Sequence, residues 1–199
     1  MSHNAIEQLE ILLKERVGVR IKRGDNSTLA AVMIIIKEEH DDYSMLFIKR
    51  IVNSSDIFSG HMAFPGGKTE EADQDTLETA IRETFEETGI DLNKAGRILG
   101  NLDDFNPNNP KAKHYIVTPY IAFISEEVEL QPHEMEIAEA LWIPLSHFRD
   151  EKNKEVRMVD KYGMKVKDFV FYYQDYVIWG MTARIFQQFL RLAGHLFKI

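Results

Sequence analysis

The chain has 199 residues and no cysteine, with 24 basic and 32 acidic residues and a formal net charge of −8 at pH 7. The absence of cysteine excludes disulfides and thiolate metal sites. The negative charge disfavours nonspecific binding to nucleic acid or to an anionic membrane surface. This length is typical of one domain, so we expect residues 1–199 to form a single unit with a substantial core.

Neither the first residues nor any apolar run of the sequence indicates export or membrane insertion. Residues 1–10 are polar and charged and lack the apolar segment of a secretory signal. The longest uncharged apolar run, 29–36, is too short to span a bilayer. We therefore expect a soluble protein of the cytoplasm.

The first part of the chain predicts a helix followed by a strand hairpin. Residues 4–16 place apolar side chains among charges at helical spacing, and we expect this helix to pack on the domain or on a partner subunit. Residues 29–36 form a continuous apolar and β-branched run, typical of a buried strand. Residues 44–49 are expected to pair with that strand across a turn at 38–42.

A glycine-containing run, 60–67, follows and ends in Phe64-Pro65-Gly66-Gly67. We expect a tight turn here, because glycine lets the backbone approach a ligand and leaves amide groups free for phosphate oxygens. Gly66 and Gly67 are therefore candidate substrate-binding residues, and the Gly67 carbonyl is a candidate metal ligand. An ordinary turn is the competing interpretation, since turns favour glycine in any case. Phe64 is interpreted as a packing anchor beneath the loop.

The next segment predicts a helix from about Thr76 to Thr88. Asp75, with Glu78 three positions later, is typical of an N-cap with a capping box. Gly89 is typical of a C-terminal stop.

Three glutamates lie close together on the surface of this predicted helix. At about 100° per residue, Glu83, Glu86 and Glu87 fall within an arc of roughly 100°. Carboxylates brought together in this way repel one another, and a hard divalent cation such as Mg²⁺ or Mn²⁺ compensates that repulsion. A solvated acidic helix face is the competing interpretation.

The rest of the chain predicts three more strands, a turn-rich loop, a hairpin and a long final helix. The strands are expected at 96–102, 115–124 and 140–143, and the loop at 105–113. The charged segment 152–167 is expected to form a hairpin with 169–173.

The final helix is expected at about 178–197. Trp179 and Phe186 lie on its apolar side and are interpreted as core residues in preference to base-stacking residues.

A strand, a glycine loop and a carboxylate-faced helix in succession resemble the Nudix hydrolases. The box of that family is Gly, five residues, Glu, seven residues, Arg-Glu, an apolar residue, any residue, Glu-Glu, any residue, Gly and an apolar residue; here it corresponds to residues 67–90. Fourteen residues separate Gly67 from Arg82, one more than in the general pattern. Asp73 or Gln74 stands in place of the first glutamate, and Thr84 in place of the first apolar residue.

The longer spacing, together with the preceding Gly-x-x-x-Phe-Pro-Gly-Gly run, resembles the coenzyme A pyrophosphatase branch. Three later segments are also similar to that branch: Glu136-Ile137-Ala138-Glu139, Trp142-Ile143-Pro144-Leu145 and residues 178–185.

One departure from that branch concerns phosphate binding. The branch carries arginines nine and four residues before the first glycine of the run, where this chain has Ile51 and Asp56. Arginine binds phosphate as a planar fork, whereas aspartate repels it. Lys49 and Arg50 are the candidate replacements.

The resemblance implies an α/β fold, an α/β/α sandwich with a mixed sheet, and Mg²⁺-dependent hydrolysis of a small-molecule nucleoside diphosphate substrate, coenzyme A or a derivative. Glu83 and Glu87 are assigned as principal metal ligands because positions i and i+4 lie on one helix face. Glu86 is a third ligand or the partner of a metal-bound water. Arg82 matches the family's arginine and is expected to orient a carboxylate.

A general base is expected outside the box. Glu136 matches the first glutamate of the Glu-x-x-Glu segment, and Glu134 and Glu139 are alternatives. His61 and His114 are candidate acids or phosphate donors, although an isolated histidine is more often structural.

Two other functions stay open at this point. One is hydrolysis of a different nucleoside diphosphate derivative, such as a nucleotide sugar, a dinucleotide or a damaged nucleoside triphosphate. The other is a non-catalytic Nudix module that binds a nucleotide. The resemblance and the two apolar terminal helices also suggest a homodimer.

Overall fold

The fold is built on a mixed sheet of seven strands in a computed structural model that describes residues 4–39, 42–52, 60–107, 114–161 and 164–199. Its central strand, β1 (Thr28–Glu39), runs parallel to β6 (Tyr115–Ile124) over ten residues of register. The other pairings are antiparallel. They join β1 to β2 (Asp42–Arg50), β6 to β5 (Gly96–Asn101), and β2 to both β3 (Met62–Ala63) and β7 (Ile137–Pro144).

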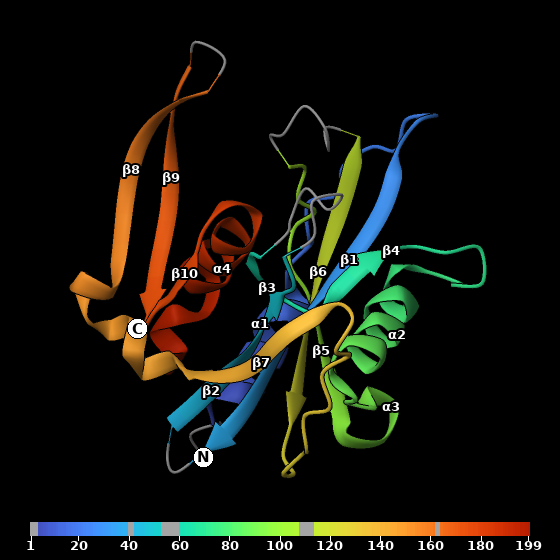
Figure 1. Ribbon diagram of the computed structural model, residues 1–199, viewed down its shortest axis with the longest axis horizontal. Helices are drawn as coiled ribbons and strands as arrows, with labels where there is room; N and C mark the ends of the chain where they lie inside the picture. Colours follow the sequence, from blue (N-terminus) through green and yellow to red (C-terminus); the bar gives the residue numbers. More distant parts are fainter. Residues whose placement is uncertain (1–3, 40–41, 53–59, 108–113, 162–163) are drawn as a thin grey trace.

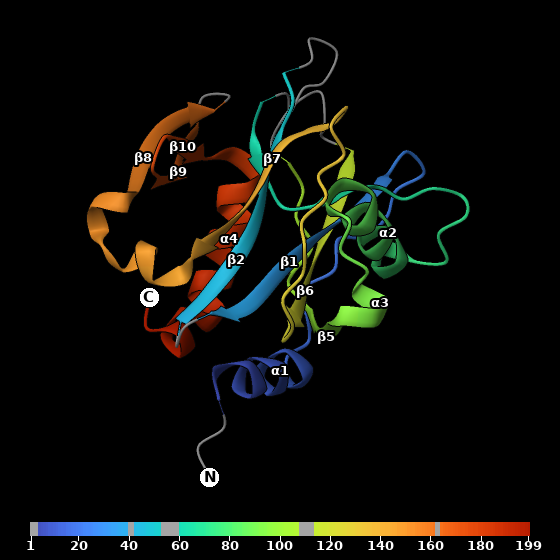
Figure 2. The same cartoon turned by 60° about the horizontal axis from the view of Figure 1, so that its bottom comes forward.

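Helices cover both faces of this sheet because alternate residues of β1 point to opposite sides. Ala30, Val32, Ile34 and Ile36 belong to a core cluster with side chains of α1 (Ala5–Glu15) and α4 (Gly180–Ala193). Ala31, Met33 and Ile35 belong to a second cluster, with α2 (Thr76–Thr88) and α3 (Leu92–Ala95). Figure 1 shows α2 and α3 on one side of the sheet and α4 on the other, and Figure 2 shows α1 against β5. The expected α/β/α sandwich is confirmed.

The sheet opens on one side of β1. Residues Ile36–Glu39 of β1 pair with β2, but Ala30–Val32 pair with β4 (Gly66–Lys68) instead. Beyond this point β2 continues with β3 and β7 as its partners. The divergence of β2 from β1 leaves a space between β4 and the end of β2, where the site described below lies.

The predicted bounds of helix α2 are confirmed. The Asp75 carboxylate accepts hydrogen bonds from the amides of Leu77 and Glu78, and Gly89 ends the helix in the left-handed region at φ 77°. In a standard capping box Glu78 would accept from the amide of the N-cap residue, Asp75. Here it accepts instead from the amide of Gln74, the residue before the N-cap, at 2.6 Å.

The threonine that replaces the box's apolar residue is buried on the inner face of α2. The hydroxyl of Thr84 donates to the Ala80 carbonyl at 2.7 Å. Its only hydroxyl is therefore satisfied within the helix, which makes this departure compatible with a buried position.

The remaining secondary structure follows β7. Two short 3₁₀ helices, η1 (Leu145–Arg149) and η2 (Glu151–Asn153), lead to a three-stranded sheet of β8 (Lys154–Lys161), β9 (Met164–Tyr173) and β10 (Tyr176–Ile178). A last 3₁₀ helix, η3 (Gly194–Phe197), follows α4. Figure 1 shows the β8–β9 hairpin standing apart from the main sheet, with α4 between them.

The predicted hairpin was wrong in its boundary. Strand β8 already ends at Lys161, and the two strands pair from Lys154 with Phe171 to Lys161 with Met164. The charges of 152–167 are divided between both strands, where Arg157 lies opposite Asp168 and Asp160 opposite Lys165. Such cross-strand pairs favour the observed register, so the charged segment is not a single strand.

The start of the final helix was also misplaced. Ile178 ends β10, Trp179 is an extended N-cap, and α4 begins at Gly180, whose φ of +66° turns the chain. Phe186 lies in the core as expected, but Trp179 does not, because 46% of its surface is exposed.

The strands expected at 29–36, 44–49, 96–102 and 115–124 are present. The turn expected at 38–42 was wrong in its bounds, because Glu38 and Glu39 of β1 pair with Tyr43 and Asp42 of β2. The strand expected at 140–143 extends over Ile137–Pro144, since its whole length pairs with β2.

The N-terminal helix packs on the chain itself through buried Ile6, Leu9 and Leu13. Within the described ranges, no helix is long and apolar enough to cross a membrane. Asp56 lies outside the described residues, as does the end of the predicted loop at 108–113.

Candidate active site

A cavity of about 500 Å³ occupies the opening between β4 and the end of β2. Glu83 and Glu87 of α2 line one part of it, together with the glycines of β4. Side chains from the start of α4 and from the segment before β3 line another part. The lining residues are Ala30, Ala31, Val32, Arg50, His61, Met62, Ala63, Phe64, Gly66, Gly67, Lys68, Glu83, Glu87, Pro107, Tyr115, Val117, Glu136, Trp179, Met181, Thr182 and Ile185.

Glu87 is the most buried acidic residue of this group, with a side chain that is 2% exposed. Its carboxylate accepts from the Gly66 amide at 2.9 Å and from Arg50 Nη1 at 3.1 Å. Burial raises the pKa of Glu87 to about 8, and the nearby carboxylates of Glu83 and Glu136 act in the same direction. The two donors oppose this effect but do not cancel it.

Glu83 lies beside the backbone of β4. A Cβ added to Gly67 would be 2.3 Å from Glu83 Oε1, so only glycine leaves room for this carboxylate. Burial is also the main cause that raises the pKa of Glu83, with Arg82 acting against it. The glycine pair and the glutamates are therefore parts of one packed arrangement.

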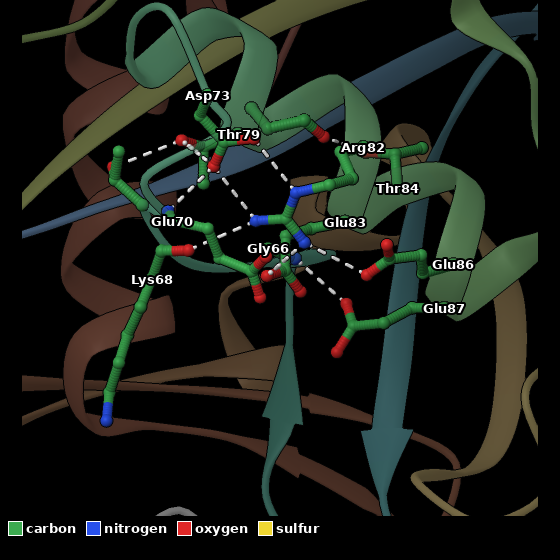
Figure 3. Close-up of polar contacts among 12 residues, drawn as sticks. Gly66, Lys68, Glu70, Asp73, Thr79, Arg82, Glu83, Thr84, Glu86 and Glu87 are labelled. Carbon is green, nitrogen blue, oxygen red and sulfur yellow. Dashed lines mark hydrogen bonds and ion pairs between the residues drawn. The ribbon is translucent and has the colours of Figure 1, made fainter.

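Arg82 is the centre of a network of charged groups, shown in Figure 3. Its Nε and Nη2 atoms contact the two carboxylate oxygens of Asp73 at 2.9 and 3.0 Å, which is a bidentate pair. Its Nη1 donates to Glu83 and to Glu86, both at 3.0 Å, and Nη2 also donates to the Lys68 carbonyl at 3.2 Å. Arg82 thus joins the loop before α2 to the outer face of that helix.

Asp73 anchors the other end of this network, although its side chain is only 2% exposed. It accepts from the Glu70 amide at 2.9 Å and from the Thr79 hydroxyl at 2.9 Å, in addition to Arg82. The Arg82 guanidinium holds the pKa of the Asp73 carboxyl well below its usual range. In this chain, Asp73 therefore serves as the partner of Arg82 at a position near the family's first glutamate.

The carboxyl groups of Glu83, Glu86 and Glu87 lie on the same side of α2, as the helical spacing predicted (Figure 3). Only Glu83 and Glu87 line the cavity, whereas Glu86 is 54% exposed and held by Arg82. Among the residues that the structure describes, no three acidic or histidine side chains are grouped so that they could hold a metal ion. The predicted convergence thus holds for two of the three glutamates.

The chemistry of these donors nevertheless fits a hard divalent cation. Glu83 and Glu87 offer carboxylate oxygens beside the cavity, and burial raises the pKa of Glu87, so a nearby cation would favour its ionised form. Arg82 contacts one oxygen of Glu83, and Arg50 contacts one oxygen of Glu87. Because an ionised carboxylate has about four acceptor sites on its two oxygens, either glutamate can bind a cation while it keeps its arginine contact.

The two basic residues at the end of β2 point in different directions, as neighbours on a strand do. Arg50 reaches Glu87 and lines the cavity. Lys49 is absent from the lining; its Nζ contacts Glu139 at 3.2 Å and lies 5.4 Å from the centre of the Tyr176 ring. The structure therefore brings Arg50, but not Lys49, to the site.

The three candidates for the general base differ in their position relative to the cavity. Glu136 lines the cavity, and its charge acts on both Glu83 and Glu87. Glu139 is bound by Lys49 and by the Tyr176 hydroxyl, which hold its pKa below the usual value. Glu134 is exposed and does not belong to the lining. Of the two histidines, His61 lines the cavity and His114 does not.

The expectation of a tight turn at Gly66-Gly67 was wrong. Both residues belong to strand β4, which pairs with Ala31 and Val32 of β1. The Gly66 amide donates to Glu87, so in this structure it is used by a side chain of the chain itself. Phe64 is a packing anchor as expected, 3% exposed and with its ring centre 4.8 Å from that of Phe47.

Two further lining residues were not among the sequence-based candidates for the site. Lys68 lies directly after the glycine pair, and its Nζ is 5.6 Å from the centre of the Tyr115 ring. The strand pairing of β4 with β1 carries Lys68 to Ala30 at the cavity wall. Lys68 could have been predicted as a site residue from its position immediately after the glycines. Nothing in the sequence indicated Tyr115, because it starts a strand far away in the sequence.

Known proteins resemble this chain in sequence and in fold. The NUDIX domain model matches residues 27–162. Over 166 residues the chain is 30% identical to "Uncharacterized Nudix hydrolase NudL" of Photorhabdus laumondii, covering 82% of this chain and 84% of that protein. Over 163 residues it is 31% identical to "Nudix hydrolase 22, chloroplastic" of Arabidopsis thaliana, covering 78% of this chain and 52% of that protein.

A solved structure covers nearly the whole chain. The crystal structure of a MutT/nudix family protein from Enterococcus faecalis has a TM-score of 0.59 and 17% identity, covering 98% of this chain and 76% of that one. At this identity the likeness concerns the fold, including the strands and helix that follow residue 162.

Proposed function

Because the chain belongs to the Nudix domain family, we propose that it is a divalent-metal-dependent hydrolase of nucleoside diphosphate derivatives. The observation that carries this proposal is the cavity in which two glutamates of α2 meet the glycine strand β4. Glu83 and Glu87 are the principal metal ligands, Glu86 is a third ligand or holds a metal-bound water, and the Gly67 carbonyl is a further candidate ligand.

The metal chemistry in this proposal is that of Mg²⁺, with Mn²⁺ as an alternative. When bound, Mg²⁺ neutralises charge on a diphosphate and activates water for attack at phosphorus. Every other function is assigned to the side chains themselves.

Three charged side chains would position and deprotonate the reactants. Glu136 accepts the proton of the attacking water, since it is the exposed carboxylate of the cavity and faces Glu83 and Glu87. Arg82 keeps Glu83 and Glu86 oriented through its anchor at Asp73. Arg50, which lines the cavity beside Glu87, donates to a phosphate oxygen.

For the substrate, we propose coenzyme A or a derivative. The support is the resemblance of residues 60–67 and of the longer box to the coenzyme A pyrophosphatase branch, together with a cavity of about 500 Å³, which suits a nucleotide-sized ligand. Cleavage of the diphosphate would give a 4′-phosphopantetheine species and adenosine 3′,5′-bisphosphate.

A substrate panel tests both levels of this proposal. Coenzyme A, an acyl derivative, a nucleotide sugar, a dinucleotide and a damaged nucleoside triphosphate would be incubated with and without Mg²⁺, and the products identified. We expect Mg²⁺-dependent turnover that is highest for coenzyme A or its derivative. Turnover of another member alone would contradict the substrate assignment while supporting the hydrolase assignment.

A non-catalytic nucleotide-binding module is the alternative from a different class. The presence of Glu83, Glu86 and Glu87 disfavours it, since a binding module does not need a complete set of carboxylates. If no compound in the panel is hydrolysed faster by the wild type than by Glu87→Gln, the binding module is the better description.

Two predictions from the sequence remain predictions, namely the cytoplasmic location and a homodimer. Sedimentation equilibrium on the full chain measures the second directly, with the mass of the monomer, 23.1 kDa, as the reference.

A further inference from the structure

Trp179 is a large aromatic side chain in an unusual place. It lies between β10 and α4, lines the same cavity as Glu83 and Glu87, and is 46% exposed. Tryptophan is enriched at interfaces, because its indole offers a large apolar contact area together with a polar N–H.

His61 is the aromatic neighbour of Trp179 in this cavity. It comes from the segment before β3, and the centres of the two rings are 4.4 Å apart at an interplanar angle of 60°. Packing against a second ring restricts the orientation of the indole. The indole is therefore both held in place and partly uncovered.

The surroundings of this ring pair are mostly uncharged. Met181, Thr182 and Ile185 of α4 line the cavity beside Trp179, and Met62 lines it beside His61. The acidic groups of the cavity come from α2 and from Glu136, the residue before β7. Arg50 is joined to His61 through the backbone, but its guanidinium donates to Glu87. The cavity thus combines a charged part, suited to a diphosphate, with a part suited to an uncharged planar group.

We propose that Trp179, oriented by His61, is the platform on which the nucleobase of the substrate stacks while the diphosphate lies at Glu83 and Glu87. A base has a planar π-face and gains about 1–3 kcal/mol from stacking on an aromatic side chain. The inference deepens the proposed function and rests on it only for the position of the diphosphate.

The first experiment measures contact with the base directly. The chain has two tryptophans, and Trp142 lies on β7, within 4.9 Å of Lys37 and outside the cavity lining. Trp142→Phe therefore leaves Trp179 as the sole indole. Its fluorescence would be titrated in Mg²⁺ with adenosine 5′-monophosphate and, separately, with ribose 5-phosphate, which lacks a base.

We expect saturable quenching by adenosine 5′-monophosphate and a much smaller response to ribose 5-phosphate. The matched variant Trp179→Phe keeps only Trp142 and should not respond to either compound. The same quenching by both compounds, no quenching by the nucleotide, or quenching that persists in Trp179→Phe would each overturn the proposal.

The second experiment separates stacking from folding. Trp179→Leu should weaken binding of adenosine 5′-monophosphate, measured by calorimetry, by about 5- to 100-fold, whereas Trp179→Phe should retain most of the affinity. Binding of ribose 5-phosphate should be the same in both variants. Far-UV circular dichroism checks that Trp179→Leu is folded, and equal losses for both ligands would contradict base stacking.

Hydrolysis distinguishes a failure of this inference from a failure of the proposed function. If the wild type hydrolyses the panel but neither the Michaelis constant nor quenching depends on Trp179, the stacking platform is wrong and the hydrolase stands. If nothing in the panel is hydrolysed but Trp179 is quenched by the nucleotide alone, the platform stands and the hydrolase is wrong.

Discussion

The two parts of the cavity are held in place in different ways. At the acidic part, one side chain, that of Arg82, makes four of the contacts, with Asp73, Glu83, Glu86 and the Lys68 carbonyl. Glu87 is bound by Arg50 and by the Gly66 amide. At the aromatic part, Trp179 follows β10 as an extended residue and is held by contact with His61.

This difference shows how one cavity can combine fixed chemistry with an adaptable recognition surface. Groups that take part in catalysis need positions accurate to a fraction of an ångström, which a network of charged hydrogen bonds provides. A stacking surface tolerates small displacements because its attraction is spread over a plane. The following substitutions test whether the acidic part is as firmly fixed as its contacts indicate.

The largest effect is expected from Glu87→Gln. The amide cannot ionise, so the variant should lose a principal metal ligand while keeping its shape and its bond from the Gly66 amide. We expect hydrolysis to fall by about 10³-fold or more, which corresponds to several kcal/mol of metal-dependent stabilisation. Initial rates on the best substrate measure this, and Glu134→Gln, an exposed residue outside the lining, is the control.

Arg82→Ala should produce the largest loss of stability. It leaves Asp73, which is 2% exposed, without its bidentate partner, and breaking such a pair costs about 3 kcal/mol. Chemical denaturation measures the free energy of unfolding. The matched control is Arg97→Ala, which removes a half-exposed pair with Glu10 at 3.1 Å and should cost less than about 1 kcal/mol. Equal losses in both variants would show that the Arg82 network does not fix the acidic part.

Gly67→Ala should reduce activity more than stability. Its new Cβ would be 2.3 Å from Glu83 Oε1, the end of a flexible side chain that can turn away. We expect kcat/KM to fall by about 10²-fold, with little change in the unfolding midpoint. Gly66→Ala provides the contrast, because its Cβ would be 2.2 Å from the Ala31 carbonyl at φ +152°, so the fold itself should be destabilised. Unchanged activity of Gly67→Ala would argue against a role for Glu83.

The last effect, which is small within any one pH unit, is a pH dependence of stability in the metal-free protein. Glu87 has a pKa of about 8 when folded, above the ordinary value of 4.5. The folded state therefore keeps a proton that the unfolded state releases, so this contribution to stability is full at low pH and is lost as the pH rises towards 8. The loss is at most about 1.4 kcal/mol per pH unit.

The comparison for this prediction is between wild type and Glu87→Gln. Denaturation in a chelator from mildly acid to mildly alkaline pH should show a steeper decline for the wild type, and added Mg²⁺ should reduce the decline. Parallel pH profiles for the two proteins would indicate that Glu87 ionises normally.

The sequence predicted best those elements that are formed by contacts between residues close together in the chain. Helix α2 was predicted to the residue, because Asp75 and Gly89 act on backbone groups within one turn. The shared side of Glu83, Glu86 and Glu87 followed from helical geometry alone. Strands β1 and β6 were recognised because their burial on both faces leaves continuous apolar runs.

What could not be predicted depends on partners far away in the sequence. Gly66 and Gly67 form a strand only because β1 has an unpaired edge at Ala31 and Val32. Arg50 and Lys49 separate because Arg50 meets Glu87 whereas Lys49 meets Glu139. The apolar pattern of the last helix continues through Trp179, so it could not show where the helix begins. The positive φ of Gly180 turns the chain there and leaves Trp179 outside the helix.

The divergence of β2 from β1 has a consequence for how such a protein can change. Four residues of the C-terminal stretch line the space that it creates, Trp179, Met181, Thr182 and Ile185, and Thr182 and Ile185 are buried. If the proposed function holds, ligand preference can therefore be varied at Trp179 and Met181 without altering either the core or the helix that carries the glutamates.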